Sequence, residues 1–314
     1  MKGKTKTHQI VSRRDFLKSS AIAVGGVCAG VSITNAYAER GKAEMRFGIV
    51  TDSHYADADP QGSRYYRQSV DKMGECVERM NEEKVDFLVE LGDLKDQRNP
   101  PGEKTALKDL DVIENVYAGF NGPRYHVLGN HDMDTISKEQ FLAHVNNTGV
   151  SKNHNYFAFD QKGLHFIVLD ANYTSEGGDY DHGNFEWTDA NVPPEELDWL
   201  KAELASTSQP VIVFVHQLLD GEGSHYVENA EQVREVLASS RNVLAVFQGH
   251  DHEGGYSCID GIHYYTLRGM VEGSGEANNS YAVVDVYNNN DLGITGFRQA
   301  GSKQMDSDRG LSGK

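Results

Sequence analysis

The segment that decides the fold spans residues 85–96 and reads VDFLVELGDLKD. A short run of aliphatic and aromatic residues ends in Gly92-Asp93, and Asp96 follows three residues later. Such a run is typical of a strand buried on both faces, and the polar cluster marks the loop at its carboxyl end. Because open α/β sheets bind their ligands at that edge, the segment predicts both an α/β fold and the location of a site.

The same plan recurs four more times along the chain. Apolar runs at 46–50, 125–128, 211–215 and 243–247 precede the clusters Asp52-x-His54, Gly129-Asn130-His131-Asp132, His216 and Gly249-His250-x-His252. Helical periodicity lies between the runs, at Tyr66, Val70, Met73, Val77 and Met80 and again at Leu197, Leu200 and Leu204. Residues 254–297 are richer in strands, with hairpin turns expected at 260–261 and 288–291. The alternation predicts one α/β domain over residues 39–300, followed by a flexible polar tail at 301–314.

The composition excludes several classes of protein. The 314 residues include 30 Lys and Arg against 47 Asp and Glu, a net charge of −17, with 38% hydrophobic residues and three cysteines. A chain this apolar is not mostly disordered, and three cysteines cannot staple a disulfide scaffold. Because an acidic surface repels phosphate backbones, we expect no nucleic-acid partner.

The first 38 residues have the layout of a signal peptide. Six basic residues and one acid occur in residues 1–18, a mildly apolar run follows, and Ala36-Tyr37-Ala38 is a small-x-small cleavage pattern. The segment Ser12-Arg13-Arg14-Asp15-Phe16-Leu17-Lys18 resembles the twin-arginine export signal. The alternative is a chance Arg-Arg pair ahead of an amphipathic helix.

The resemblance implies that the twin-arginine machinery is a partner and that the protein is exported already folded, to the periplasm or beyond. The apolar run is too short and too rich in glycine for a stable membrane anchor. Loss of residues 1–38 would change the net charge from −17 to −22.

The five polar clusters together supply carboxylates, imidazoles and one amide oxygen. This donor set suits Mn, Fe or Zn, and it holds too many ligands for one tetrahedral site. Two metal ions about 3.5–4 Å apart would use the whole set. We expect a hydroxide that bridges the two ions to attack phosphorus in line.

The order and spelling of the clusters resemble the calcineurin-like metallophosphoesterase superfamily, whose pattern is D-x-H, G-D-x-x-D, G-N-H-[DE], H and G-H-x-H. The resemblance covers residues 52–252 and implies a four-layer α/β/β/α sandwich of two mixed sheets flanked by helices. It also implies roles for ten residues. Asp52, His54 and His252 would bind the first metal, Asp93 would bridge, and Asn130, His216 and His250 would bind the second. His131 would protonate the leaving group, Asp132 would orient its ring, and Asp96 would support the ligands from behind.

A second, narrower resemblance concerns the substrate. The stretch from His54 to Ser69 is similar to one in the manganese-dependent ADP-ribose/CDP-alcohol diphosphatases, although that group has Gln where this chain has His54. By this resemblance Arg64 or Arg67 would clamp a second phosphate, and Tyr55 or Tyr65 would stack on a base or ribose. The alternative is that the arginines are solvated helix residues. The loop at 172–194 is another candidate wall of the pocket, unless it packs only on itself.

Three functions remain open from the sequence. The first is an exported dinuclear-metal phosphoesterase that hydrolyses small phosphate esters. The second is a diphosphatase or phosphodiesterase that cleaves the anhydride of nucleotide derivatives such as ADP-ribose. The third is a metal- or nucleotide-binding protein without catalysis, against which the intact set of clusters argues.

Overall fold

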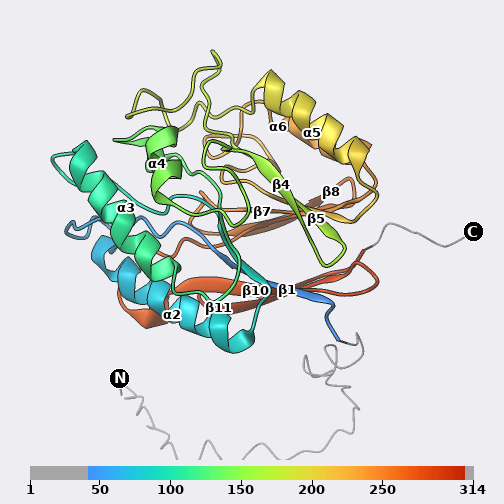
Figure 1. Ribbon diagram of the computed structural model, residues 1–314, viewed down its shortest axis with the longest axis horizontal. Coiled ribbons are helices and arrows are strands. Elements are labelled where there is room, and N and C mark those ends of the chain that lie inside the picture. Colours follow the sequence, from blue (N-terminus) through green and yellow to red (C-terminus); the bar gives the residue numbers. More distant parts are fainter. Residues whose placement is uncertain (1–41, 308–314) are drawn as a thin grey trace, which may run out of the picture. The chain divides into compact units, whose positions relative to one another are not determined.

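The computed structural model describes residues 42–307 and places two six-stranded sheets face to face, with helices on their outer sides (Figure 1). The first sheet has the order β12-β11-β10-β1-β2-β3 and the second β4-β5-β6-β7-β9-β8. The first contains β1 (Met45–Val50), β2 (Phe87–Glu90), β3 (Arg124–His126), β10 (Ser280–Val286), β11 (Leu292–Arg298) and β12 (Lys303–Met305). The second contains β4 (Phe157–Gln161), β5 (Leu164–Val168), β6 (Val211–Phe214), β7 (Val243–Gln248), β8 (Gly255–Ile259) and β9 (Ile262–Thr266).

Helices cover the outer face of each sheet. Residues of α2 (Ser69–Glu83), α3 (Glu103–Tyr117) and α4 (Lys138–His144) share a core with the first sheet. Residues of α5 (Pro194–Ser206) and α6 (Ala230–Ser239) share another with the second. The predicted four-layer sandwich is therefore confirmed. Among the described residues, no helix combines the length and the apolar character needed to cross a membrane.

Strand β1 shows why these runs are mostly apolar. Phe47 and Ile49 face the core between the sheets, whereas Val50 faces the helices. Successive side chains of a strand point to opposite faces, so a strand covered on both sides is mostly apolar, and polar residues such as Arg46 and Glu90 stand near the strand ends. Phe47 stacks on Phe87 with ring centroids 5.0 Å apart and meets Phe214 edge-on at 5.7 Å.

The sheet topology brings the polar clusters together. Strands β1, β2 and β3 are mutually parallel, as are β5, β6, β7 and β9, while the remaining pairs are antiparallel. Both sheets are therefore mixed. The loops after β1, β2, β3, β6 and β7 leave their sheets at carboxyl ends, as the recurring plan predicts.

Two expectations need correction. The tail predicted from residue 301 begins instead with β12, whose residues pair with β11. The helical pattern from Tyr66 begins with a short 3₁₀ turn, Tyr66–Gln68, before α2 starts at Ser69. The predicted export signal at 1–38 and the end of the tail at 308–314 lie outside the described residues.

Candidate metal centre

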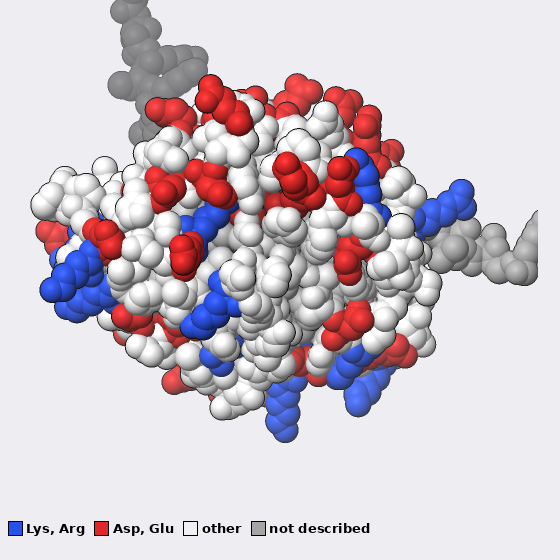
Figure 2. Space-filling view, turned by 45° about the horizontal axis from the view of Figure 1, so that its top comes forward, with Lys and Arg blue, Asp and Glu red and all other residues white. Residues whose placement is uncertain are grey.

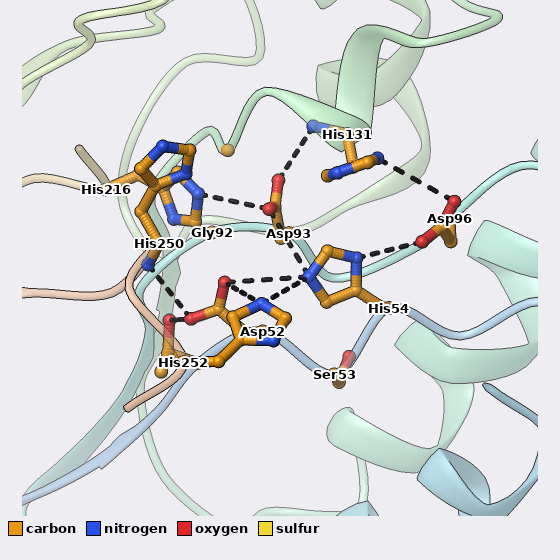
Figure 3. A network of polar contacts seen from close by, with 12 residues as sticks. Asp52, Ser53, His54, Gly92, Asp93, Asp96, His131, His216, His250 and His252 are labelled. Atoms are coloured by element: carbon orange, nitrogen blue, oxygen red, sulfur yellow. Dashed lines mark hydrogen bonds and ion pairs between the residues drawn. The ribbon is translucent and has the colours of Figure 1, made fainter. Parts of the chain in front are cut away.

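Side chains from four loops point toward one another at the carboxyl ends of the strands (Figure 3). Asp52 and His54 follow β1, Asp93 follows β2, His216 follows β6, and His250 and His252 follow β7. The structure thus brings together the residues that the sequence selected from positions as far as 200 residues apart along the chain.

The first group of ligand atoms comprises Asp52, His54 and His252. His54 Nε2 lies 3.0 Å from His252 Nε2, and His252 Nε2 lies 3.2 Å from Asp52 Oδ1. The three side chains each offer an atom within 4.8 Å of the others.

The second group comprises Asp93, His216 and His250, again within 4.8 Å of one another. Asp93 Oδ2 lies 3.1 Å from His216 Nε2 and 3.5 Å from His54 Nε2. One carboxylate oxygen therefore reaches both groups, as a bridging ligand must. Asn130 is buried on the turn that precedes His131.

Two of these polar atoms, Asn130 Oδ1 and His250 Nε2, are buried without a hydrogen-bond partner. Asp52 Oδ1 and His216 Nε2 are also buried without a hydrogen bond and face other ligand atoms of the centre, His252 Nε2 at 3.2 Å and Asp93 Oδ2 at 3.1 Å. A buried polar atom left unpaired costs about 1–3 kcal/mol, so such a concentration needs a compensating partner. Cations would supply it, and the donors fit Mn, Fe or Zn.

A second set of partners aims the histidine lone pairs into the centre. His216 Nδ1 donates to the Leu91 carbonyl at 2.8 Å, and His54 Nδ1 donates to Asp96 Oδ2 at 3.0 Å. His252 Nδ1 donates to Glu272 Oε1 at 2.6 Å. Because each Nδ1 carries its proton, each Nε2 is free to bind a metal. The structure places Asp96 in the supporting position expected of it.

In the absence of metal, protons occupy part of this space. Burial lowers the pKa of His216, but the charge and hydrogen bond of Asp93, together with the charge of Asp52 and the Leu91 carbonyl, outweigh burial and raise the pKa to about 10. Burial likewise lowers the pKa of His252, but the charge and hydrogen bond of Asp52, together with the hydrogen bond to Glu272, raise it to about 9. Metal ions and protons therefore compete for the same nitrogens.

The backbone is strained at four ligands. Asp52, His54, Asp93 and His250 have φ of 52°, 45°, 59° and 66°, in the left-handed region. This conformation costs about 1–2 kcal/mol per residue. Hydrogen bonds between the loops hold it, including Asp52 N to Gly92 O at 3.0 Å and His54 N to Asp93 O at 2.8 Å.

Two glycines in the predicted clusters allow the loops to touch. A Cβ at Gly129 would lie 2.1 Å from the Asp93 nitrogen, and one at Gly249 would lie 2.1 Å from Thr51 Oγ1. Neither contact is physically possible, so any side chain at these positions would push the two ligand loops apart.

His131 stands at the rim of the site. Its backbone nitrogen donates to Asp93 Oδ1 at 2.8 Å, and its ring Nδ1 contacts Asp134 Oδ2 at 2.8 Å. Burial lowers the pKa of His131, but the charges of Asp93 and Asp134 outweigh burial and raise the pKa to about 9. The ring is therefore protonated at neutral pH and can donate a proton.

The role predicted for Asp132 is wrong. Its carboxylate accepts the backbone amides of Gly129 at 2.9 Å, Asp93 at 3.1 Å and Lys95 at 3.2 Å, and does not contact the His131 ring. It joins the loops after β2 and β3. The carboxylate that orients the ring is Asp134, three residues after His131 in the same turn, and that spacing was the signal available in the sequence.

The four predicted substrate residues separate into distinct environments. Arg64 lies next to the site, with Nη1 3.8 Å from Asp96 Oδ2. Arg67 pairs with Asp57 and Asp59, both at 2.6 Å, on the exposed surface. Tyr55 is half-buried and packs against the core that the first sheet shares with α2, α3 and α4, the helix-side core. Tyr65 is half-buried and donates its backbone amide to Val271 O at 3.1 Å.

The long loop at 172–194 packs partly on itself and also reaches a ligand of the metal centre. Tyr180 is buried and stacks on Phe185 with ring centroids 3.7 Å apart, so the loop packs partly on itself. Trp187 is 42% exposed, and its ring lies 5.7 Å from the His250 ring. His225, which the sequence did not single out as a site residue, lies 5.4 Å from the same ring.

Comparisons with known proteins agree with this site. The sequence profile described as calcineurin-like phosphoesterase matches residues 45–254. The chain is 27% identical to the manganese-dependent ADP-ribose/CDP-alcohol diphosphatase of Arabidopsis thaliana, over 77% of this chain and 91% of that protein. It is also 27% identical to the protein of that name from Bos taurus, over 80% of this chain and 91% of that protein.

Solved structures share the fold. A dimetal phosphatase from Danio rerio superposes with a TM-score of 0.74 at 22% identity, covering 85% of this chain and all of that chain (100%). A purple acid phosphatase from yellow lupin superposes with a TM-score of 0.58 at 14% identity, covering 83% of this chain and 52% of that one.

A matched pair of substitutions separates Asp134 from Asp132. Asp134→Asn should lower kcat on a phosphate ester by about 10–100-fold, part of the 10²–10⁴ that a positioned general acid contributes, with little change in stability. Asp132→Asn should lower the free energy of unfolding by about 1–3 kcal/mol, because it removes an acceptor from buried amides. Kinetics and urea unfolding measure the two effects. An equal loss of kcat in Asp134→Asn and Asp132→Asn, measured where both variants are folded, would contradict the assignment of Asp134 as the carboxylate that orients the His131 ring.

Metal binding should release protons. Since His216 and His252 have pKa values raised to about 10 and about 9, both are protonated in the metal-free protein at about pH 7. The apparent affinity for Mn²⁺ should therefore rise with pH up to about pH 10. Calorimetry at about pH 7 in buffers of different ionisation enthalpy measures the release. A heat of binding that is the same in all buffers would show the prediction to be wrong.

Proposed function

This chain belongs to the calcineurin-like phosphoesterase family, and from that membership we propose that it cleaves the phosphoanhydride bond of small diphosphate compounds such as nucleotide derivatives. The family is one of dimetal phosphoesterases, and the protein is a metal-dependent phosphoric ester hydrolase. The names of its curated relatives support the choice of an anhydride.

The position of Arg64 is the observation that carries the proposal. Its side chain is 33% exposed and lines, together with His131, a cleft of about 850 Å³ next to the ligand groups. Arg98 and Arg67 also line the cleft, but both are committed to carboxylates, Arg98 to Asp109 at 2.5 Å and Arg67 to Asp57. Arg64 has the longer carboxylate contact, 3.8 Å to Asp96 Oδ2, so of these three arginines it is the least committed to a carboxylate and would bind a second phosphate.

The remaining residues fit such a reaction. When bound, two metal ions would lower the pKa of a water molecule and neutralise charge on the phosphoryl oxygens. Asp93 would hold the two ligand groups together and fix the position of the His131 backbone. His131 would give a ring proton to the leaving oxygen while Asp134 holds the ring. Manganese is the first choice of metal, with Fe and Zn as the alternatives.

The charge of the surface favours a small substrate. Acidic side chains dominate the upper part of the face in Figure 2, and few basic ones lie among them. A long polyanion would meet this acidic surface over its whole length, whereas a small diphosphate meets only the cleft.

A substrate panel tests the function. With Mn²⁺, kcat/KM on ADP-ribose should exceed that on p-nitrophenyl phosphate and bis(p-nitrophenyl) phosphate. Arg64→Gln should lower the ratio of kcat/KM for ADP-ribose to that for p-nitrophenyl phosphate by about 10–100-fold, the worth of a charged hydrogen bond of about 1.5–3 kcal/mol.

Arg67→Gln is the matched control in the same cleft and should leave that ratio within about threefold, since exposed ion pairs contribute about 0–1 kcal/mol. A wild-type preference for p-nitrophenyl phosphate would favour the simple ester. No turnover of any of the three substrates would favour a binding protein.

We also propose that residues 1–38 direct export of the folded protein by the twin-arginine route, on the strength of Arg13-Arg14 and the layout around them. Arg13→Lys with Arg14→Lys should retain the full-length chain in the cytoplasm of a bacterial host. Lys4→Arg is the control and should be exported like the wild type. Cell fractionation followed by immunoblotting measures the outcome, and normal export of the double variant would refute the proposal.

A further inference from the structure

Lys72 is a buried lysine whose ammonium is enclosed by backbone carbonyls. Its side chain leaves α2 and is 1% exposed. Its Nζ donates to four oxygens, Met270 O at 2.7 Å, Gly273 O at 2.8 Å, Glu272 O at 3.1 Å and Asn278 O at 3.3 Å. An ammonium taken from water is costly unless dipoles replace its hydration, and these carbonyls do so.

All four carbonyls belong to the irregular stretch after β9, here called the 270–278 segment. Its backbone has few restraints of its own, since Gly273 and Gly275 have φ of 73° and 78° and a single 3₁₀ turn, Glu276–Asn278, is its regular element. One antiparallel bridge joins Glu272 to Arg64, and Gln68 Oε1 accepts from Gly275 N at 2.7 Å, while the Lys72 ammonium binds carbonyls at both ends of the segment.

The 270–278 segment touches the first ligand group. Met270 N donates to Thr51 O at 3.1 Å and Val271 N donates to Asp52 O at 2.9 Å, so the segment lies along the strained loop that carries Asp52. The carboxylate of Glu272 accepts the proton of His252 Nδ1 at 2.6 Å. That contact sets the rotation and the tautomer of a metal-binding ring.

The same segment backs the loop that carries Arg64. Gly273 N donates to Ser63 O at 2.8 Å and Tyr65 N donates to Val271 O at 3.1 Å, on either side of Arg64. A shift of the segment would therefore move the His252 ring and the Arg64 backbone together.

We propose that Lys72 is a positioning residue for this site. By clamping the 270–278 segment, it fixes Glu272 against His252 and, through the paired backbone, fixes Arg64 at the cleft. Lysine suits the task because its stem reaches through the helix-side core and its three N–H donors can serve several carbonyls at once. The part that concerns Arg64 rests on the function proposed above.

The first test compares Lys72→Met with Lys108→Met, the same change at an exposed lysine of α3. Lys72→Met should weaken one of the two Mn²⁺ binding steps by about 10–100-fold, the usual effect of losing support behind a ligand. Hydrogen exchange should accelerate at amides of the 270–278 segment. Lys108→Met should change neither. Titration followed by the electron paramagnetic resonance of free Mn²⁺ and mass-spectrometric hydrogen exchange make the two measurements.

Chemical rescue gives a second, sharper readout. In Lys72→Ala, n-propylammonium replaces the missing atoms and should restore Mn²⁺ affinity saturably. Tetramethylammonium has the same charge but no N–H donor and should not. A double-mutant cycle with Glu272→Gln should be non-additive in Mn²⁺ affinity, because both residues act on the same ring.

Unchanged Mn²⁺ affinity and unchanged exchange in Lys72→Met would overturn the proposal. So would a lower thermal midpoint with normal Mn²⁺ affinity, which would make Lys72 a residue of general stability. If Lys72→Met does not fold, Lys72→Gln is judged by the same outcomes. Neither measurement needs a substrate, so a wild-type protein without turnover would refute the proposed function and leave this test intact.

Discussion

The carboxylate of Asp93 is the contact on which the rest of the site depends. Its Oδ2 reaches both His54 and His216, while its Oδ1 holds the backbone of His131. One side chain from the loop after β2 thus joins loops of both sheets. The strands that carry these loops are packed on both faces, so the sandwich holds the loops around Asp93 rigidly.

The sequence predicts the parts of this structure that local pattern determines. Apolar runs that end in polar clusters locate β1, β2, β6 and β7, because a doubly covered strand is apolar over most of its length. Strand β4 has no such signal, because it lies at a sheet edge and is only partly buried. Helix α3 is not among the predicted helices. Its residues Ala106, Leu110, Ile113 and Tyr117 are spaced by four, three and four, so its helical periodicity is nevertheless present in the sequence. The ligands could be named because their spelling is local to each loop.

The supporting residues could not be predicted in the same way. Glu272 contacts His252 across 20 residues of the chain and Lys72 contacts the Glu272 carbonyl across 200, and nothing in the sequence around them marks the partner. Arg67 pairs with Asp57 and Asp59 in the folded chain, and the sequence around this predicted phosphate clamp does not reveal the pairing. The error at Asp132 has a similar origin, since adjacency to His131 in the sequence does not decide which carboxylate faces the ring in space.

The left-handed backbone at Asp52, His54, Asp93 and His250 restricts how this protein can evolve. Asp, Asn and His tolerate that conformation better than other side chains, and β-branched residues are nearly excluded from it. A substitution at one of these four positions must therefore be compatible with the left-handed backbone as well as with metal binding. His131, His216 and His252 carry no such restriction, because their φ angles are not positive. A lineage that abandons catalysis but keeps the fold should therefore lose these three histidines first, and the four strained positions should persist longest.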